Sequence, residues 1–270
     1  MSQNIDPFPF TNSNWRGMVL VWDEQAIFLG LAGAASLHES PAIKICISLE
    51  GSFGLQTQED DTFTNYESAI IAPGQAHAID GRHNKMAMLL LVPEAKLAQS
   101  LVSIYSANGI TRLSSNVVVK VRRVLEALIQ RLDSGDADES VEIYCSQIVN
   151  NLTDNKNAPI DSRVTQGIEW IRARRDDDIT VEDIARSVEL SESRFSHIFT
   201  DNVRISVRRY LLWLRLRDAM TLLSQGKSLT ETAHEAGFSD SAHLTRTFRG
   251  MLGIAPSALT KESLLISFLD

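Results

Sequence analysis

The fourteen residues TVEDIARSVELSES, at positions 180–193, recur in outline 48 residues later as SLTETAHEAGFSDS, at positions 228–241. The matched pairs share size or chemistry: Thr180 with Ser228, Asp183 with Glu231, Ala185 with Ala233 and, after one inserted residue, Phe199 with Phe248. A repeat of this kind indicates that one supersecondary unit is used twice.

Each copy carries the signals of a short helix, a tight turn and a second helix. Residues 180–183 (TVED) and 228–231 (SLTE) are capping-box patterns that open a helix. Gly237 can supply the positive φ that ends the first helix of the second copy. Ser191 and the pair Ser239-Asp240 offer N-caps for the helix that follows. The pattern predicts two helix-turn-helix units.

The second helix of each predicted unit has an apolar face and a polar face. The apolar side chains, which should point inward, are Phe195, Ile198 and Phe199 in the first unit and Leu244, Phe248 and Leu252 in the second. The outward side chains are small or hydrogen-bonding: Ser193, Ser196, His197 and Thr200 in the first unit, and Ala242, Thr245, Arg246 and Arg249 in the second. Small residues let a helix enter the major groove deeply, and Arg can bind guanine through two hydrogen bonds. The alternative is that both faces are merely solvated. The presence of two copies of the unit with matched caps favours DNA binding.

Positive charge gathers between the two units. The chain has a net charge of −8, of which residues 1–160 carry −7 and residues 161–270 carry −1. The stretch from Arg194 to Asp218 holds six arginines against two aspartates, a local charge of +4. A local basic patch attracts the phosphate backbone. Arg208 and Arg209 are the candidate phosphate contacts.

The segment Ser206–Ser224 is apolar on nearly every side, which is typical of a buried helix. Its 19 residues would span about 28 Å. One turn of B-DNA is about 34 Å. A rigid spacer of that length could place two recognition helices in successive major grooves on one face of DNA.

Residues 179–260 closely resemble the DNA-binding domain of AraC/XylS-type transcription regulators, including the linking helix and the closing segments 237–240 (GFSD) and 253–256 (GIAP). The resemblance implies that the base-facing residues are Ser193, Ser196, His197, Ser241, Ala242, Thr245 and Arg246. It also implies an activator that binds double-stranded DNA and RNA polymerase and responds to a small effector held by the first domain. The sequence departs from the family at Glu189, Arg204 and Val207, where Gly, Gly and Pro are usual. A left-handed residue other than glycine costs free energy, so the expected turn is less secure in the first unit.

The first half of the chain predicts short strands between residues 17 and 92, separated by turn residues, as in a sandwich or barrel. Within 43–49, apolar residues alternate with Lys44, Cys46 and Ser48, which predicts one buried face. Two amphipathic helices are expected at 116–132 and 139–152. The predicted fold is therefore α+β: a cupin-like β-barrel with following helices at 1–152, a linker at 153–162, and an all-α domain with two helix-turn-helix units joined by a long helix at 163–270.

The barrel resembles a cupin, the usual partner domain of this family. Residues 73–77 (PGQAH) are similar to the second cupin motif, and His38 falls near the position of the first. A metal needs three or four converging ligands, and the paired histidines of the first motif are missing. We therefore expect His38 and His77 to line an effector pocket, with no metal, cofactor or catalytic residue. Two alternatives stay open: a metal-dependent cupin enzyme with an appended DNA-binding domain, and a regulator that needs no small effector.

The remaining features predict a cytoplasmic protein. No signal-peptide pattern and no apolar stretch of membrane-spanning length is visible, so no membrane partner is expected. Cys46 and Cys145 are far apart in apolar segments, as free thiols in a reducing compartment would be. The apolar stripe along 116–132 fits either packing on the barrel or contact with a second copy, so a homodimer is possible.

Overall fold

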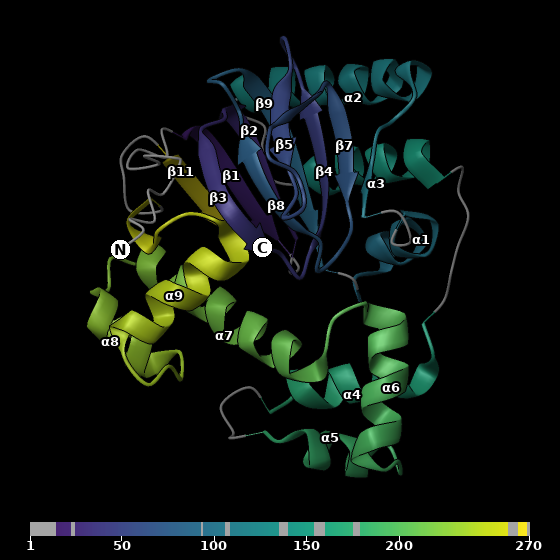
Figure 1. Cartoon of the computed structure of the whole chain (residues 1–270), viewed down its shortest axis with the longest axis vertical. Helices are drawn as coiled ribbons and strands as arrows, with labels where there is room; N and C mark the ends of the chain where they lie inside the picture. The colour runs from purple at the N-terminus through teal and green to yellow at the C-terminus, as the bar shows by residue number, and fades with distance from the viewer. Residues whose placement is uncertain are drawn as a thin grey trace.

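The structure is a computed structural model that describes residues 15–22, 25–92, 94–105, 109–134, 140–153, 160–174, 179–258 and 264–268. A β-rich domain lies above an all-helical domain in Figure 1. The predicted α+β class, with strands first and helix-turn-helix units second, is confirmed. Within the described residues, none of the helices combines the length and the apolar character that a membrane span requires.

The first domain is built from two sheets that face each other. The larger has the strand order β10-β7-β4-β9-β2-β1-β11 and the smaller has the order β3-β8-β5-β6. Their bounds are β1 Arg16–Trp22, β2 Gln25–Leu31, β3 Ala34–Glu39, β4 Ile43–Ser48, β5 Phe53–Gln56, β6 Thr64–Tyr66, β7 Ser68–Ile71, β8 Ala76–Asp80, β9 Lys85–Leu91, β10 Ile110–Thr111 and β11 Leu264–Phe268. An apolar cluster that includes Phe28, Phe53 and Met88 fills the space between the sheets. This arrangement is the expected cupin-like barrel.

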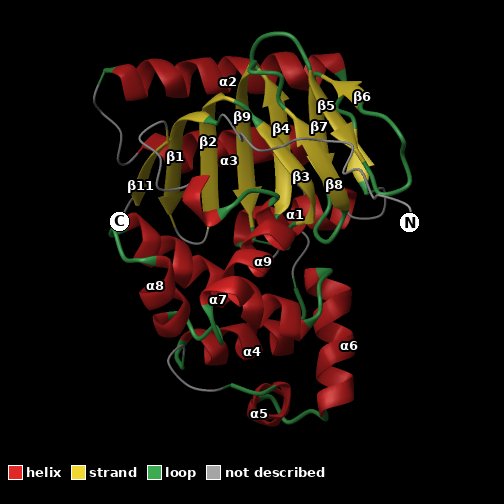
Figure 2. Cartoon of the chain, turned by 60° about the vertical axis from the view of Figure 1, so that its left-hand side comes forward, coloured by secondary structure: helices red, strands yellow, loops and turns green. Residues whose placement is uncertain are grey.

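Three helices pack on the large sheet. They are α1 (Lys96–Tyr105), α2 (Ser115–Asp133) and α3 (Ser140–Thr153), and Figure 2 shows α2 and α3 along the sheet. Val121, Leu125 and Leu128 of α2 join Ile45 of the sheet and Ile148 of α3 in one buried cluster. The apolar stripe predicted for 116–132 therefore packs within the chain. Helix α1 was not predicted.

Strand β4 corrects the sequence analysis. The alternation in 43–49 predicted one buried and one solvent-facing side, and this prediction was wrong because all six residues of β4 are buried. The strand lies in the middle of the large sheet. Ile43, Ile45 and Ile47 pack toward the helices, whereas Cys46 belongs to the cluster inside the barrel. Lys44, which alternates in the same way as Cys46, is consequently buried on the interior side.

The second domain contains the predicted repeat. Its helices are α4 Ser162–Arg172, α5 Val181–Ser187, α6 Glu192–Val203, α7 Val207–Ser224, α8 Leu229–Glu235 and α9 Ser241–Leu252, followed by the 3-10 turn η2 Pro256–Ala258. Helices α5 and α6 form the first unit, α8 and α9 form the second, and α7 connects them. Both capping boxes are formed, at Thr180 and at Ser228. Ser191 caps α6 and Asp240 caps α9, as the sequence predicted.

The two units share their turn geometry although their residues differ. Glu189 has a φ of 57° where the second unit has Gly237 at 72°. Arg204 ends α6 at 67°, and Gly253 ends α9 at 73°. A non-glycine residue in this region costs roughly 1–2 kcal/mol. The first unit therefore has the same turns as the second, at a cost in stability. The expected turn forms in the first unit although Glu189 and Arg204 stand where glycine is usual.

The end of the chain was predicted wrongly. All residues after the linker were expected to be helical, but Leu264–Phe268 forms β11 and pairs in parallel with β1, from Gly17↔Leu264 to Val21↔Phe268. Figure 1 shows this last, yellow strand beside the purple β1. A five-residue apolar run such as LLISF fits a strand or a buried helix equally well. Most of the predicted linker, residues 154–159, lies outside the described residues.

Candidate DNA-binding and effector-binding sites

The predicted recognition faces point away from the domain core. Phe195 and Phe199 of α6 and Leu244 and Phe248 of α9 are buried. The opposite side chains are exposed (Ser193, His197, Ala242, Arg246 and Arg249) or half-buried (Ser196, Ser241 and Thr245). Leu252, expected to point inward, is half-buried, and Met251 takes its place in the core.

Contacts within each helix determine which donors and acceptors these faces present to solvent. The Thr245 hydroxyl donates to the carbonyl oxygen of Ser241 at 2.8 Å, so its oxygen remains available as an acceptor. His197 Nε2 lies 3.2 Å from a carboxylate oxygen of Asp201, one helical turn away on α6. Both interactions hold polar side chains along the helix surface.

The two candidate phosphate contacts have different surroundings. Arg208 is exposed. Arg209 instead reaches the barrel, where its Nη1 lies 2.6 Å from the Glu39 carboxylate. Its Nη2 donates to the Glu39 carbonyl oxygen at 2.7 Å. In this conformation Arg209 connects the two domains, and only Arg208 is directed to solvent.

The structure brings the two candidate effector residues, His38 and His77, together and adds Lys44 between them. Their rings lie 4.2 Å apart between centroids. Lys44 Nζ is 2.6 Å from His38 Nε2 and 3.1 Å from His77 Nε2. All three residues are buried. Lys44 was missed because the alternation in β4 assigned it to a solvent-facing side.

Backbone carbonyls fix the tautomers of both histidines. His38 Nδ1 is 2.7 Å from the Ser36 carbonyl oxygen, and His77 Nδ1 is 2.7 Å from that of Gln75. Each Nδ1 must therefore carry the proton, which leaves each Nε2 to accept a hydrogen bond from Lys44. An ammonium has three donors. Two are used here, and one remains.

Burial governs the charges of this cluster. It lowers the pKa of both histidines well below their ordinary value, and the charge of Lys44 lowers them further. Burial also lowers the pKa of Lys44 to about 8. At neutral pH the cluster is thus one ammonium between two neutral imidazoles. No carboxylate among the described residues lies within ion-pair distance of Lys44, so within this part of the chain the buried ammonium has no counter-ion.

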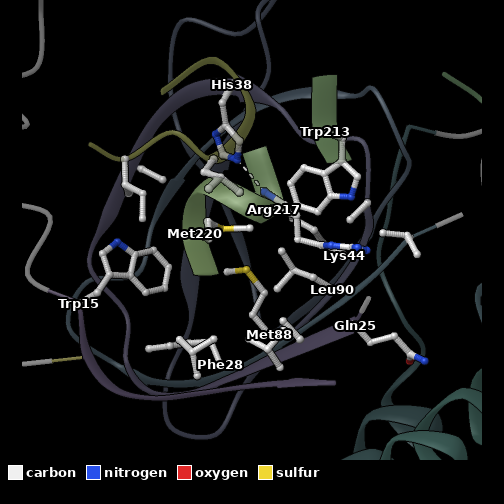
Figure 3. Close-up of a pocket in the computed structure, with 18 of the residues that line it drawn as sticks. Trp15, Gln25, Phe28, His38, Lys44, Met88, Leu90, Trp213, Arg217 and Met220 are labelled. Atoms are coloured by element: carbon white, nitrogen blue, oxygen red, sulfur yellow. Dashed lines mark hydrogen bonds between the residues drawn. The ribbon is translucent and has the colours of Figure 1, made fainter. Parts of the chain in front are cut away.

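A cavity of about 170 Å³ is lined by His38 and Lys44 of this cluster and extends between the two domains. His77, which was also expected to line an effector pocket, is not among its wall residues. Figure 3 shows Trp15, Phe28 and Met88 of the barrel opposite Trp213, Arg217 and Met220 of α7. Its other apolar wall residues include Val19 and Val21 of β1, Leu90 of β9, and Leu252 and Ile254 at the end of α9. The cavity is therefore apolar, with cationic groups at one side, and both domains contribute to it.

Two wall residues present further buried polar atoms. Gln25 and Trp213 line the cavity. Their atoms Gln25 Oε1 and Trp213 Nε1 are buried and have no hydrogen-bond partner within the described part of the chain. A buried polar atom without a partner costs free energy.

The cluster does not suit a metal ion. Both Nε2 atoms point at the Lys44 ammonium, which occupies the position a shared ion would need. Across the described ranges, no group of three or more His, Cys, Asp or Glu side chains could hold a metal. This disfavours the alternative of a metal-dependent cupin enzyme.

Comparisons with known proteins agree with this geometry. Residues 184–262 match a family model described as a helix-turn-helix domain. The Msm operon regulatory protein of Streptococcus mutans is 30% identical over 147 residues, which cover 54% of this chain and 47% of that protein. The chain thus spans about half the length of that relative. The HTH-type transcriptional regulator YdeC of Bacillus subtilis is 21% identical over 253 residues, 85% of this chain and 87% of that protein.

Solved structures show the same fold over nearly the whole chain. An apo structure of a ToxT point variant from Vibrio cholerae has a TM-score of 0.60 and 12% identity, covering 88% of this chain and 97% of ToxT. Another ToxT structure, with a TM-score of 0.54 and 13% identity over 87% of this chain and 92% of ToxT, contains an unsaturated fatty acid. The fold and the repeat define a two-domain helix-turn-helix protein. Residues 184–262 carry a helix-turn-helix domain, and the chain is similar to a bacterial operon regulator over 147 residues.

Proposed function

We propose that this protein is a sequence-specific transcription regulator that acts on double-stranded DNA in the cytoplasm. Bases would be read by Ser193, Ser196, His197, Ser241, Ala242, Thr245, Arg246 and Arg249, and phosphates bound by Arg208 and Arg209. The exposed polar faces of α6 and α9, each backed by buried aromatic or aliphatic residues, support this assignment. Activation through RNA polymerase, and a homodimer, are parts of the same proposal that rest on the family resemblance.

The proposed effector is an apolar molecule with a carboxylate. One observation carries this choice: the Lys44 ammonium is buried, lacks a carboxylate partner among the described residues and has one donor left at the wall of an apolar cavity. A charge buried without a partner is unfavourable, and a carboxylate would supply both the opposite charge and an acceptor. The unsaturated fatty acid in ToxT is a molecule of this class.

The cavity size limits the chain length of the effector. An engineered apolar cavity of about 150 Å³ accepts benzene. The cavity between the domains, about 170 Å³, would accept a chain of roughly six carbons. A longer acid would require the walls to move.

Effector binding would alter DNA binding because both domains form the cavity. A ligand shifts an equilibrium only if it binds two conformations unequally. Trp213 and Met220 of α7 and Leu252 at the end of α9 contribute to the wall. Turning the second unit away from the barrel would remove these contacts. A bound effector would therefore stabilise the arrangement in which the domains touch.

The test is a calorimetric titration with hexanoate and, as its uncharged match, hexan-1-ol. Hexanoate should bind, and Lys44→Met should abolish that binding while reducing hexanol binding little. Above about pH 8 the affinity for hexanoate should fall up to tenfold per pH unit as Lys44 loses its charge. His77→Ala should also weaken hexanoate binding, because His77 Nε2 helps to hold the Lys44 ammonium. Equal binding of both compounds to the wild type and to Lys44→Met would show that Lys44 does not hold the effector.

A further inference from the structure

The two recognition helices are not parallel in this conformation. In Figure 1, α6 stands upright and α9 lies at an angle to it. Lines that are parallel in space stay parallel in every view, so the two helices differ in direction. Two equivalent units that enter successive major grooves on one DNA face must be related mainly by a shift along the DNA axis, which keeps their helices parallel. One unit must therefore turn before both can bind.

The second unit is fastened to the barrel on both sides of η2. Just before this turn, the Gly253 carbonyl oxygen accepts hydrogen bonds from the Ser36 amide at 2.9 Å and the Ser36 hydroxyl at 3.0 Å. Beyond it, the chain returns to the barrel as β11, which pairs with β1 over five residue pairs. The end of the chain thus lies in the sheet of the other domain, as Figure 2 shows at the β11 edge.

We propose that β11 is a latch that holds the second unit in the orientation unsuited to two-groove binding. The strand is five residues long and lies at the end of the large sheet, paired to β1 on one side. A short edge strand can leave its sheet without disturbing the strands beneath it. This inference rests on the proposed function, because it concerns how the two units reach DNA.

The latch also connects the cavity with the DNA-binding domain. Val19 and Val21 of β1 line the cavity, and the same residues are register partners of Ile266 and Phe268 in β11. An effector that packs against β1 would stabilise the strand with which β11 pairs. Effector binding and release of the second unit would then oppose each other.

The test uses the full chain with Leu265→Pro and Ile266→Pro combined. Neighbouring residues of a strand point their amides to opposite sides, so one of the two prolines must remove a donor to β1. Leu265→Val with Ile266→Val keeps both amides and the preference for a strand, and serves as the control. DNA with two half-elements and DNA with one half-element are the probes.

The proline variant should bind the two-element DNA roughly tenfold tighter than the wild type or the control. Binding to single-element DNA should change less than about twofold, since the face of each recognition helix is already exposed. Equal affinities of the proline variant and the wild type for two-element DNA would overturn the latch and leave the proposed function standing. If neither protein prefers any DNA sequence, the proposed function itself fails.

A second measurement needs no variant. Hydrogen exchange of the wild type should show that, within Arg16–Trp22, the amides that face β11 lose protection when two-element DNA binds and keep it when single-element DNA binds. If protection of this strand is the same with both DNAs, β11 stays in place and the latch is wrong.

Discussion

The backbone amide of Ser36, in strand β3 of the barrel, donates a hydrogen bond to the carbonyl oxygen of Gly253, which ends recognition helix α9, at 2.9 Å. Gly253 is left-handed, with a φ of 73°, and it allows the helix end to approach the barrel closely. A Cβ at this position would lie 2.5 Å from His38 Nδ1 and 2.7 Å from the Ser36 carbonyl oxygen. The end of α9, the proposed recognition helix, thus approaches the proposed effector cluster closely.

Gly253→Ala should separate the second unit from the barrel. The new methyl group would meet the backbone of β3, which cannot move aside. Gly226→Ala is the matched control, because Gly226 has a φ of 84° and open space around it. Both variants should lose about 1–2 kcal/mol from the left-handed conformation. Only Gly253→Ala should lose more and lower the hydrogen-exchange protection of Ala34–Glu39. Equal losses of stability would show that this contact contributes little.

The pH dependence of stability should report the burial of Lys44. Folding lowers the pKa of Lys44 from 10.5 to about 8, so between these values the unfolded state binds more protons and the free energy of unfolding rises with pH. Below about pH 8 Lys44 is charged in both states, so the full free-energy cost of burying the charge lowers the stability of the folded protein. From pH 7 to pH 10 the wild type should gain about 2–3 kcal/mol relative to Lys44→Met.

Urea denaturation at the two pH values measures this difference. Lys85→Met, which removes an exposed lysine, should show no comparable change relative to the wild type. A constant difference between the wild type and Lys44→Met at both pH values would mean that Lys44 is not charged and buried in the folded state.

The salt dependence of DNA binding should distinguish Arg208 from Arg209. Each phosphate contact contributes about −0.9 to the slope of log affinity against log salt concentration. Arg208→Ala should flatten the slope by about that amount without changing the preferred sequence. Glu39→Gln should free Arg209 from its 2.6 Å ion pair and steepen the slope. A change of preferred bases in Arg208→Ala would identify a base reader in place of a phosphate contact.

Arg246 should contribute to specificity more than to stability. Its side chain is exposed on α9, opposite the buried Leu244 and Phe248, so Arg246→Ala should leave the melting temperature nearly unchanged. A bidentate contact with guanine is worth about 1–3 kcal/mol, which corresponds to a loss of roughly 5- to 150-fold in affinity for the specific site. Arg186→Ala, which removes an exposed arginine of α5, is the control. If specific and non-specific DNA weaken equally in Arg246→Ala, this residue contacts phosphate only.

The second domain could be predicted from the sequence because its signals are local. Capping boxes, the apolar face of each recognition helix and the N-caps each depend on residues within a few positions of one another. His38 and His77 were singled out in another way, through the resemblance of the barrel to a cupin.

The features that were missed depend on contacts far apart in the chain. Lys44 is buried because β4 is covered on both faces, which its alternating sequence does not reveal. β11 becomes a strand because the edge of β1, more than 240 residues earlier, is available to it. The cavity exists only where α7 and α9 meet the barrel, so neither domain alone could have indicated it.

The most direct test of the account is selection of bound DNA from a random pool by the full chain, followed by footprinting of the enriched sequence. The account predicts an asymmetric site with two half-elements about 10 base pairs apart, protected on one face of the DNA, and loss of one half-element's preference in Arg246→Ala. Enrichment of a palindrome, of a single half-element or of no sequence would contradict it.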